Sequence, residues 1–210
     1  DKTSHSLSPI IFNYWFKLYN ISAKYYFLEV KKNNFEKTLL EKIGDKKTFG
    51  FNITIPFKKD VFRHIELKNV HAKNIGAINC VKIQKKNKGI NTDWVGYLNS
   101  IKGYKIKKSQ KVIVLGCGGA SQAIVYGLYY TGFKNILIFN RSKKLIKVQE
   151  KKFYTRKYSV IDKNLYDVDL IINTTPINPL SKKQIMKVNE NAIVSDIVYK
   201  PKNTIFLNSF

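Results

Sequence analysis

The sequence predicts an α/β protein with two domains. Short runs typical of strands alternate along the 210 residues with runs that have helical spacing. In the second half, the continuous apolar run 111–115 (KVIVL) leads into a glycine-rich loop and then into an apolar run of helical length, 120–130. A strand, a glycine loop and a helix in this order are typical of a doubly wound parallel sheet.

The expected elements of the first half follow from helix caps and apolar spacing. Ser8 and Pro9 predict a helix start, with a hydroxyl at the N-cap and proline in the first turn, and the apolar face continues to Leu18. Residues 25–30 have the composition of a strand, and Asn34 is expected to cap the helix that follows it. The remaining elements are strands at 50–55 and 77–83, a turn at 85–89 and a helix from Asp93 to Ile101.

Beyond residue 103 the pattern changes, and residues 111–115 form a continuous apolar strand of the type buried in a parallel sheet. The expected strands are residues 111–115, 135–139, 169–173 and 192–196. Helices are expected at 120–130 and 142–152, and the domain boundary is expected near residues 100–105.

Composition excludes several classes of protein. Hydrophobic residues make up 44% of the chain, which argues against disorder. The apolar runs are far shorter than the ~18 residues of a membrane span, and none resembles a signal peptide. Two cysteines, Cys80 and Cys117, are too few for a disulfide-built fold or a cysteine zinc site. We therefore expect a reduced, cytoplasmic protein without a metal.

The formal net charge of +24 raises the question of nucleic-acid or membrane binding. Only Arg63, Arg141 and Arg156 are arginines among the 38 basic residues, although base readout and phosphate clamping favour the arginine fork. The lysines are spread along the chain, which is typical of a solvated surface. A nucleic-acid-binding module is the last of the alternatives, and no membrane partner is expected.

The glycine loop, residues 116–121 (GCGGAS), is the strongest signal for a ligand. Gly116 permits a tight turn, and Gly118 and Gly119 let the backbone approach a pyrophosphate at the N-terminus of the next helix. A turn that merely requires glycine is the alternative. The position between a buried strand and a helix favours a dinucleotide.

The end of the second strand indicates which dinucleotide is bound. An NAD site usually has Asp or Glu ~20 residues past the loop, to bind the ribose hydroxyls. Residues 139–144 (FNRSKK) contain no carboxylate, and Arg141 can fork to a 2′-phosphate, with Ser142 and Lys144 as further donors. A basic turn in a basic protein is the alternative. The sequence predicts NADP.

Four polar clusters in the first hundred residues lie at strand ends or helix starts, where an open α/β sheet forms its ligand crevice. They are SLSP (6–9), NITIPFK (52–58), GAIN (76–79) and NTD (91–93). Their hydroxyls, amides, single lysine and single aspartate suit a small polyhydroxylated acid. Each cluster alone is explained as well by a cap or a turn.

Together and in this order, the motifs resemble the shikimate dehydrogenase family. HSLSP, GFNITIPFK, GAINC, NTDWVG, GCGGAS, NRS, NTTP and DIVYKP occur along essentially the whole chain, and NITIPFK and NTDWVG are the more specific ones. The resemblance implies NADP-dependent interconversion of 3-dehydroshikimate and shikimate by hydride transfer, in aromatic amino acid biosynthesis.

The resemblance also implies roles for individual residues. Lys58 and Asp93 would be the catalytic pair, and the Pro-Phe-Lys spacing selects Lys58 over Lys59. A lysine beside a carbonyl oxygen can donate the proton that a ketone reduction needs. The implied substrate ligands are Ser6, Ser8, Asn52, Thr54, Asn79, Asp93 and Tyr199. The implied cofactor contacts are Gly116, Gly118, Gly119, Ala120, Ser121, Asn140, Arg141, Ser142 and Thr174.

The expected organisation is a substrate-binding catalytic α/β domain at 1–102 and an NADP-binding Rossmann domain at 103–200. Residues 201–210 would start a return segment to the first domain. The chain departs from the family at Cys80, where threonine is usual, and it begins and stops inside the family's length. An NAD-using quinate/shikimate dehydrogenase relative and a truncated, inactive NADP-binding protein are therefore alternatives. A homodimer is one possible assembly.

Overall fold

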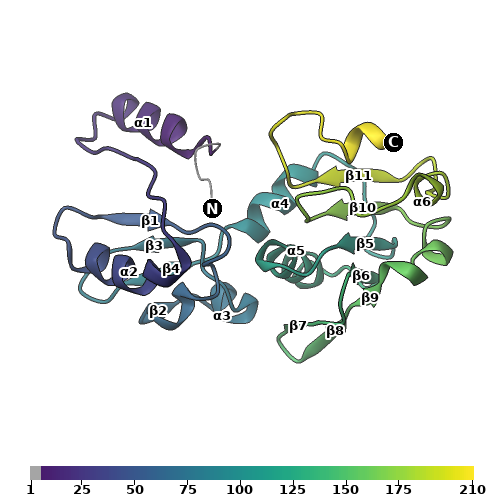
Figure 1. Ribbon diagram of the computed structural model, residues 1–210, viewed down its shortest axis with the longest axis horizontal. Coiled ribbons are helices and arrows are strands. Elements are labelled where there is room, and N and C mark those ends of the chain that lie inside the picture. The colour runs from purple at the N-terminus through teal and green to yellow at the C-terminus, as the bar shows by residue number, and fades with distance from the viewer. Residues whose placement is uncertain (1–5) are drawn as a thin grey trace.

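The computed structural model describes residues 6–210 and contains two lobes, each built around its own sheet (Figure 1). His5, the first residue of the HSLSP motif, lies outside the described residues. The first lobe has a mixed four-stranded sheet, and the second has a parallel five-stranded sheet. The two-domain α/β class predicted from the sequence is confirmed.

The first lobe is small. Its sheet has the order β1 (Gly50–Asn52), β3 (Cys80–Lys82), β4 (Lys88–Ile90) and β2 (Leu67–Lys68). Its helices are α1 (Ser8–Leu18), α2 (Phe35–Gly44) and α3 (Val70–Ile75), with short 3₁₀ turns at Lys32–Asn34 and Val61–Arg63. The buried core of this lobe comprises Phe35, Leu39, Val61, Ile65, Ala72, Ile78 and Val81.

The second lobe is doubly wound about β5 (Val112–Leu115). The chain proceeds outward through β6 (Ile136–Asn140) to β9 (Arg156–Lys157), and then returns to the other side of β5 for β10 (Leu170–Asn173) and β11 (Ile193–Asp196). The carboxyl end of β5 is thus the switch point at which such sheets bind ligands. Helix α5 (Gly119–Tyr130) starts there.

Helix α4 (Asp93–Ile101) lies between the two sheets and packs along α5 (Figure 1). Tyr97 and Ile101 belong to the same core as the parallel sheet, and so do Ile75 and Ala77 of the first lobe. At the other end of the chain, Phe206 is fully buried against the opposite face of the parallel sheet. The domain limits at 102 and 200 remain a prediction.

The prediction of a strand at 25–30 is wrong: the segment is irregular and pairs with no strand in residues 6–210. The side-chain amide of Asn13 takes the place of a neighbouring strand, because it accepts from the backbone N–H of Tyr25 and donates to its carbonyl, both at 2.8 Å. A strand-like composition does not form a strand without a partner for its backbone groups.

The prediction of a helix at 142–152 is also wrong. The segment forms the antiparallel hairpin of β7 (Leu145–Val148) and β8 (Lys151–Tyr154). Ile146, Val148 and Phe153 are buried while the residues between them are exposed, which is the two-residue period of a strand. This hairpin fills the place expected for a crossover helix between β6 and β9.

Other boundaries shift by small amounts. The strands expected at 50–55 and 77–83 are shortened to three residues each, and β4 begins inside the turn expected at 85–89. Leu7 and Thr92 occupy the N-cap positions expected for Ser8 and Asp93. The second lobe also contains α6 (Lys182–Ile185) and 3₁₀ turns at Tyr158–Val160, Asp162–Asn164 and Leu207–Ser209. Within residues 6–210, no helix has the length and apolarity needed to cross a membrane.

We expect faster amide hydrogen exchange in the first lobe than in strands β5 and β6. Every residue of β5 is buried, whereas β1 has one half-buried residue between two exposed ones, and none of residues Ser8–Leu18 is buried. Few buried contacts allow local opening at low free energy. Exchange measured by mass spectrometry on peptides from both lobes tests this, and equal protection of β1 and β5 would contradict it.

Candidate active site

Lys58 and Asp93 form an ion pair at the junction of the lobes. The Lys58 Nζ lies 2.7 Å from Asp93 Oδ2, and the amide of Asn79 donates to Asp93 Oδ1, also at 2.7 Å. The side chains of Lys58 and Asp93 are 15% and 24% exposed, so both are partly shielded from water yet reachable by a small molecule. The two carboxylate oxygens of Asp93 thus each have a donor from a different part of the chain.

Backbone hydrogen bonds bring these residues together. The N–H of Ile78 donates to the carbonyl of Lys58 at 2.8 Å, and the N–H of Ile53 donates to the carbonyl of Asn79 at 2.8 Å. These bonds dock the turn after β1 against the segment that enters β3. The NITIPFK and GAIN clusters therefore lie side by side at one end of the first sheet.

Asn91 secures the third cluster. Its buried amide, 2% exposed, donates to the carbonyl of Ala77 at 3.1 Å and accepts from the N–H of Asp93 at 3.0 Å. Thr92 in turn donates its N–H to Asn79 Oδ1 at 2.9 Å. The NTD cluster was identified from the sequence, but a role was predicted only for Asp93. The structural role of the Asn91 amide could not be predicted, because no sequence spacing indicates which backbone groups it binds.

The remaining predicted substrate ligands form no side-chain hydrogen bond with either member of the Lys58–Asp93 ion pair within residues 6–210. The Ser6 hydroxyl donates to that of Ser8 at 3.1 Å, and Asn52 accepts from the Tyr25 hydroxyl at 3.1 Å. Thr54 and Tyr199 are exposed, and their side chains form no hydrogen bond within residues 6–210. Tyr199, on the second lobe, is 58% exposed. The structure thus brings Lys58, Asn79 and Asp93 into direct contact, whereas Asn52 contacts Tyr25 and Ser6 contacts Ser8.

The glycine loop has the geometry that a close approach of a ligand requires. Gly116 has a φ of +106°, and a side chain there would meet Thr174 Oγ1 at 2.6 Å, so only glycine fits. A side chain at Gly118 would meet nothing within 4 Å, which leaves open space above the loop. The open space and the N-terminus of the twelve-residue α5 fit a pyrophosphate.

Ser121 and Thr174, predicted as cofactor contacts, use their hydroxyls inside the protein. The buried Ser121 Oγ accepts from the N–H of Gly118 at 3.3 Å and lies 2.5 Å from Thr174 Oγ1. Thr174 Oγ1 donates to the carbonyl of Leu115 at 2.6 Å. These bonds hold the glycine loop to β5 and β10, whereas Ala120 follows in the first turn of α5.

The end of β6 fits a 2′-phosphate. Arg141 and Ser142 are exposed, and the Asn140 amide donates to the Ser142 carbonyl at 3.0 Å, which shapes the turn. Burial raises the pKa of the Cys117 thiol, and the charges of Lys144 and Lys59 oppose this rise, so both lysines lie near the loop. The cationic turn, free of carboxylates from 139 to 144, favours a phosphorylated ribose.

Lys58 connects the two halves of the site. A side chain built on Gly119 would lie 3.8 Å from both Cβ and Cδ of Lys58, so the lysine stem passes directly beside the glycine loop. The ion pair of the first lobe and the dinucleotide loop of the second are thus in contact. This is the arrangement that a hydride transfer between a dinucleotide and a small substrate needs.

Comparisons with known proteins agree with this arrangement. The family model described as shikimate dehydrogenase substrate binding domain matches residues 1–81, and that described as shikimate / quinate 5-dehydrogenase matches residues 100–203. A curated relative from Clostridium beijerinckii, named shikimate dehydrogenase (NADP(+)), is 36% identical over 99% of this chain and 78% of its own length. The chain belongs to the shikimate dehydrogenase family.

Solved shikimate dehydrogenases have the same fold. The Aquifex aeolicus structure has a TM-score of 0.83 at 30% identity and covers 98% of this chain and 78% of its own. Shikimate dehydrogenase 1 from Peptoclostridium difficile has a TM-score of 0.84 at 29% identity, over 100% and 79% of the two chains. The family resemblance stated from the motifs is confirmed.

Two residues that border the candidate site of this shikimate dehydrogenase family member were not identified from the sequence. Tyr25 lies among the substrate-ligand candidates, and Tyr158 lies beside the cofactor loop. Burial raises the pKa of Tyr158 to about 12, while the Arg141 charge and the Gly116 backbone oppose this rise. Neither tyrosine belongs to a motif, so only the tertiary structure identifies them.

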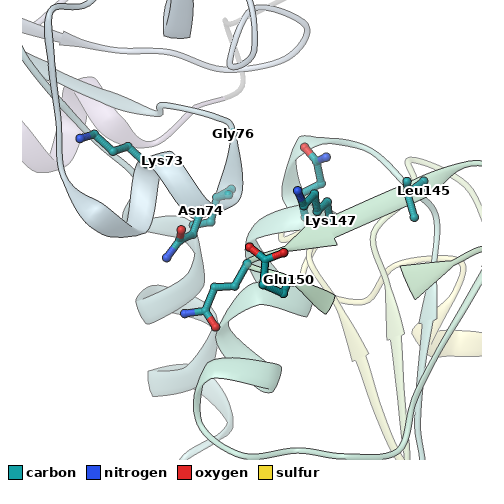
Figure 2. Close-up of a pocket in the computed structure, with 9 residues that line it drawn as sticks. Lys73, Asn74, Gly76, Leu145, Lys147 and Glu150 are labelled. Atoms are coloured by element: carbon teal, nitrogen blue, oxygen red, sulfur yellow. The ribbon is translucent and has the colours of Figure 1, made fainter. Parts of the chain in front are cut away.

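A separate cavity lies between α3 and the β7–β8 hairpin (Figure 2). Figure 2 shows Asn74 and Gly76 on one side, facing Lys147 and Glu150 on the other. Gly76 is the first residue of the GAIN cluster, but none of the lining residues is among the implied substrate ligands or cofactor contacts. The cavity is lined by lysines and by a glutamate, so its charges favour neither an anionic nor a cationic ligand. We assign the cavity no role in the reaction.

Proposed function

We propose that this protein catalyses the NADP-dependent interconversion of 3-dehydroshikimate and shikimate. The observation that carries the proposal is the Lys58–Asp93 ion pair of 2.7 Å, whose lysine passes beside Gly119 of the dinucleotide loop. The name of the Clostridium beijerinckii relative, with its NADP(+), supports both the reaction and the cofactor. Such a reaction contributes to aromatic amino acid biosynthesis.

In the proposed mechanism, the bound cofactor would supply the hydride chemistry: NADPH would give a hydride in ketone reduction, and NADP⁺ would accept one in the reverse reaction. The Lys58 ammonium donates a proton to the carbonyl oxygen as that oxygen gains negative charge, and the neutral amine recovers the proton in alcohol oxidation. Asp93 holds the ammonium in place, and Asn79 holds the carboxylate of Asp93. Partial burial strengthens these electrostatic interactions relative to water.

The proposed substrate contacts divide between the two groups of ligands. Hydroxyls of Ser6 and Ser8 would bind the carboxylate, and Asn52, Thr54, Asn79 and Asp93 would bind ring hydroxyls. Tyr199 would approach from the second lobe. The proposed cofactor contacts are those of the glycine loop and the turn after β6, with Ser121 and Thr174 acting through the shape of the loop because their hydroxyls are engaged.

The test is reduction of NADP with shikimate as the substrate, followed by the absorbance of the reduced nicotinamide. We expect turnover that depends on shikimate and is faster with NADP than with NAD. Equal use of NAD and quinate would favour the quinate/shikimate alternative. Binding of NADPH without turnover of either acid would instead identify an inactive NADP-binding protein.

We further propose a cytoplasmic location, supported by the free thiols of Cys80 and Cys117. The proposed partners are the small-molecule substrate and its cofactor. A homodimer remains a prediction, for which sedimentation of the purified protein is the direct measurement.

A further inference from the structure

Tyr25 connects two groups of proposed substrate ligands that come from different elements. Its hydroxyl donates to Asn52 Oδ1 at 3.1 Å, at the end of β1. The Ser8 side chain, in the first turn of α1, lies near the same phenol, where it opposes the rise in the pKa of Tyr25 that burial causes. One phenol thus lies between the proposed carboxylate ligands and a proposed hydroxyl ligand.

The position of Tyr25 is itself well defined. The side-chain amide of Asn13 binds both backbone groups of Tyr25 at 2.8 Å. The ring stacks on Phe12, with centroids 4.7 Å apart and planes inclined by 11°. Because these contacts do not involve the hydroxyl, replacing the tyrosine by phenylalanine removes one oxygen and leaves the ring and backbone held as before.

The direction of the Tyr25–Asn52 hydrogen bond has a chemical consequence. A phenol that donates to Asn52 Oδ1 keeps the amide oxygen on its own side, so Nδ2 is turned away from Tyr25. An exposed asparagine without such a donor can rotate its amide and present either an acceptor or a donor. With Tyr25 in place, Asn52 offers N–H donors to the oxygen of a substrate hydroxyl.

We propose that Tyr25 is a positioning residue that fixes the Asn52 amide with its N–H donors toward the substrate. This inference rests on the proposed function, because the substrate hydroxyl is that of shikimate. Tyr25 does not take part in the proton transfer, which belongs to Lys58 and Asp93. Its removal therefore weakens substrate binding and leaves the chemical step intact.

The kinetic test compares Tyr25→Phe with Tyr26→Phe. Tyr26 is the next residue and is exposed, and its hydroxyl accepts a hydrogen bond from Lys42 Nζ at 3.3 Å. It therefore controls for loss of a phenol oxygen. For Tyr25→Phe we expect the KM for shikimate to rise about fivefold to tenfold, the scale of one hydrogen bond. For the same variant, we expect kcat and the KM for NADP to stay within about twofold of the wild type, and the unfolding midpoint to be unchanged. We expect Tyr26→Phe to match the wild type in all of these quantities. An unchanged KM for shikimate in Tyr25→Phe would overturn the inference.

A double-mutant cycle asks whether Tyr25 acts through Asn52. In an Asn52→Ala background, Tyr25→Phe is expected to change the KM for shikimate by less than about twofold, because the amide that it positions is gone. A rise as large as in the wild-type background would show that Tyr25 acts by another route, and the assignment would be lost.

A third measurement does not depend on turnover. The side-chain NH₂ signals of Asn52 in ¹⁵N-labelled protein without substrate are assigned by their loss in Asn52→Ala. Tyr25→Phe should shift these signals and leave those of Asn79 in place, whereas unchanged Asn52 signals would overturn the inference. Failure of the proposed function would be seen separately, as absent oxidation of shikimate by the wild-type protein.

Discussion

Replacing Lys58 by alanine is expected to lower kcat for shikimate oxidation by about 100-fold or more, the usual scale for a positioned acid–base group. Within residues 6–210, Lys58 is the basic residue that forms an ion pair with Asp93, and its stem lies beside the glycine loop. In the direction of shikimate oxidation, its removal takes away the group that accepts the proton of the substrate hydroxyl. Within residues 6–210, the Asp93 carboxylate then retains the hydrogen bond from the Asn79 amide. Steady-state kinetics with saturating NADP and shikimate measure the effect.

Lys59→Ala is the matched control. Lys59 is the next residue and has the same charge, but it is exposed and its charge acts on Cys117 rather than on Asp93. We expect kcat for Lys59→Ala to stay within about threefold of the wild type. If the two variants lose activity to the same extent, the proton donor has been assigned to the wrong lysine or the wrong site.

Replacing Arg141 by alanine is expected to weaken NADP binding at least tenfold, or about 1.4 kcal/mol, and to change NAD binding little. Arg141 is exposed directly after β6, where no carboxylate lies between residues 139 and 144 to bind ribose hydroxyls instead. A guanidinium that forks to the 2′-phosphate contributes only to the phosphorylated cofactor. Fluorescence titration with NADPH and NADH measures both affinities.

Arg63→Ala separates this specific contact from the general positive charge of the protein. Arg63 is also exposed, but it lies in the 3₁₀ turn Val61–Arg63 of the first lobe, whereas Arg141 follows β6 in the second lobe. We expect Arg63→Ala to leave the ratio of the two affinities unchanged. Equal losses of NADPH and NADH binding in Arg141→Ala would refute the assignment of Arg141 to the 2′-phosphate.

The local sequence predicted those parts of the molecule whose structure depends on local chemistry. Apolar runs predicted β5, β6 and β10, which are mostly or wholly buried, because a strand covered on both faces has no polar side to alternate with. The predicted β11 is half-buried along its length. The φ of +106° at Gly116 favours glycine over other residues, so the conformation of the loop is reflected in its glycine content. The pairing of Lys58 with Asp93 followed from motif order and family resemblance, and the structure brings the two side chains into contact.

Only the tertiary structure decided features that depend on partners distant in the chain. Residues 25–30 have a strand-like composition, yet Asn13 binds the backbone of Tyr25 in place of a neighbouring strand. The segment after β6 became a hairpin because Ile146, Val148 and Phe153 are buried together, a match between two short runs that helical spacing could not reveal. Tyr25 and Tyr158 belong to no motif, and their positions beside the candidate ligands follow from the tertiary structure. The sequence by itself therefore determined the fold class and the chemistry of the motifs, whereas strand pairing and the surroundings of the ligands required long-range contacts.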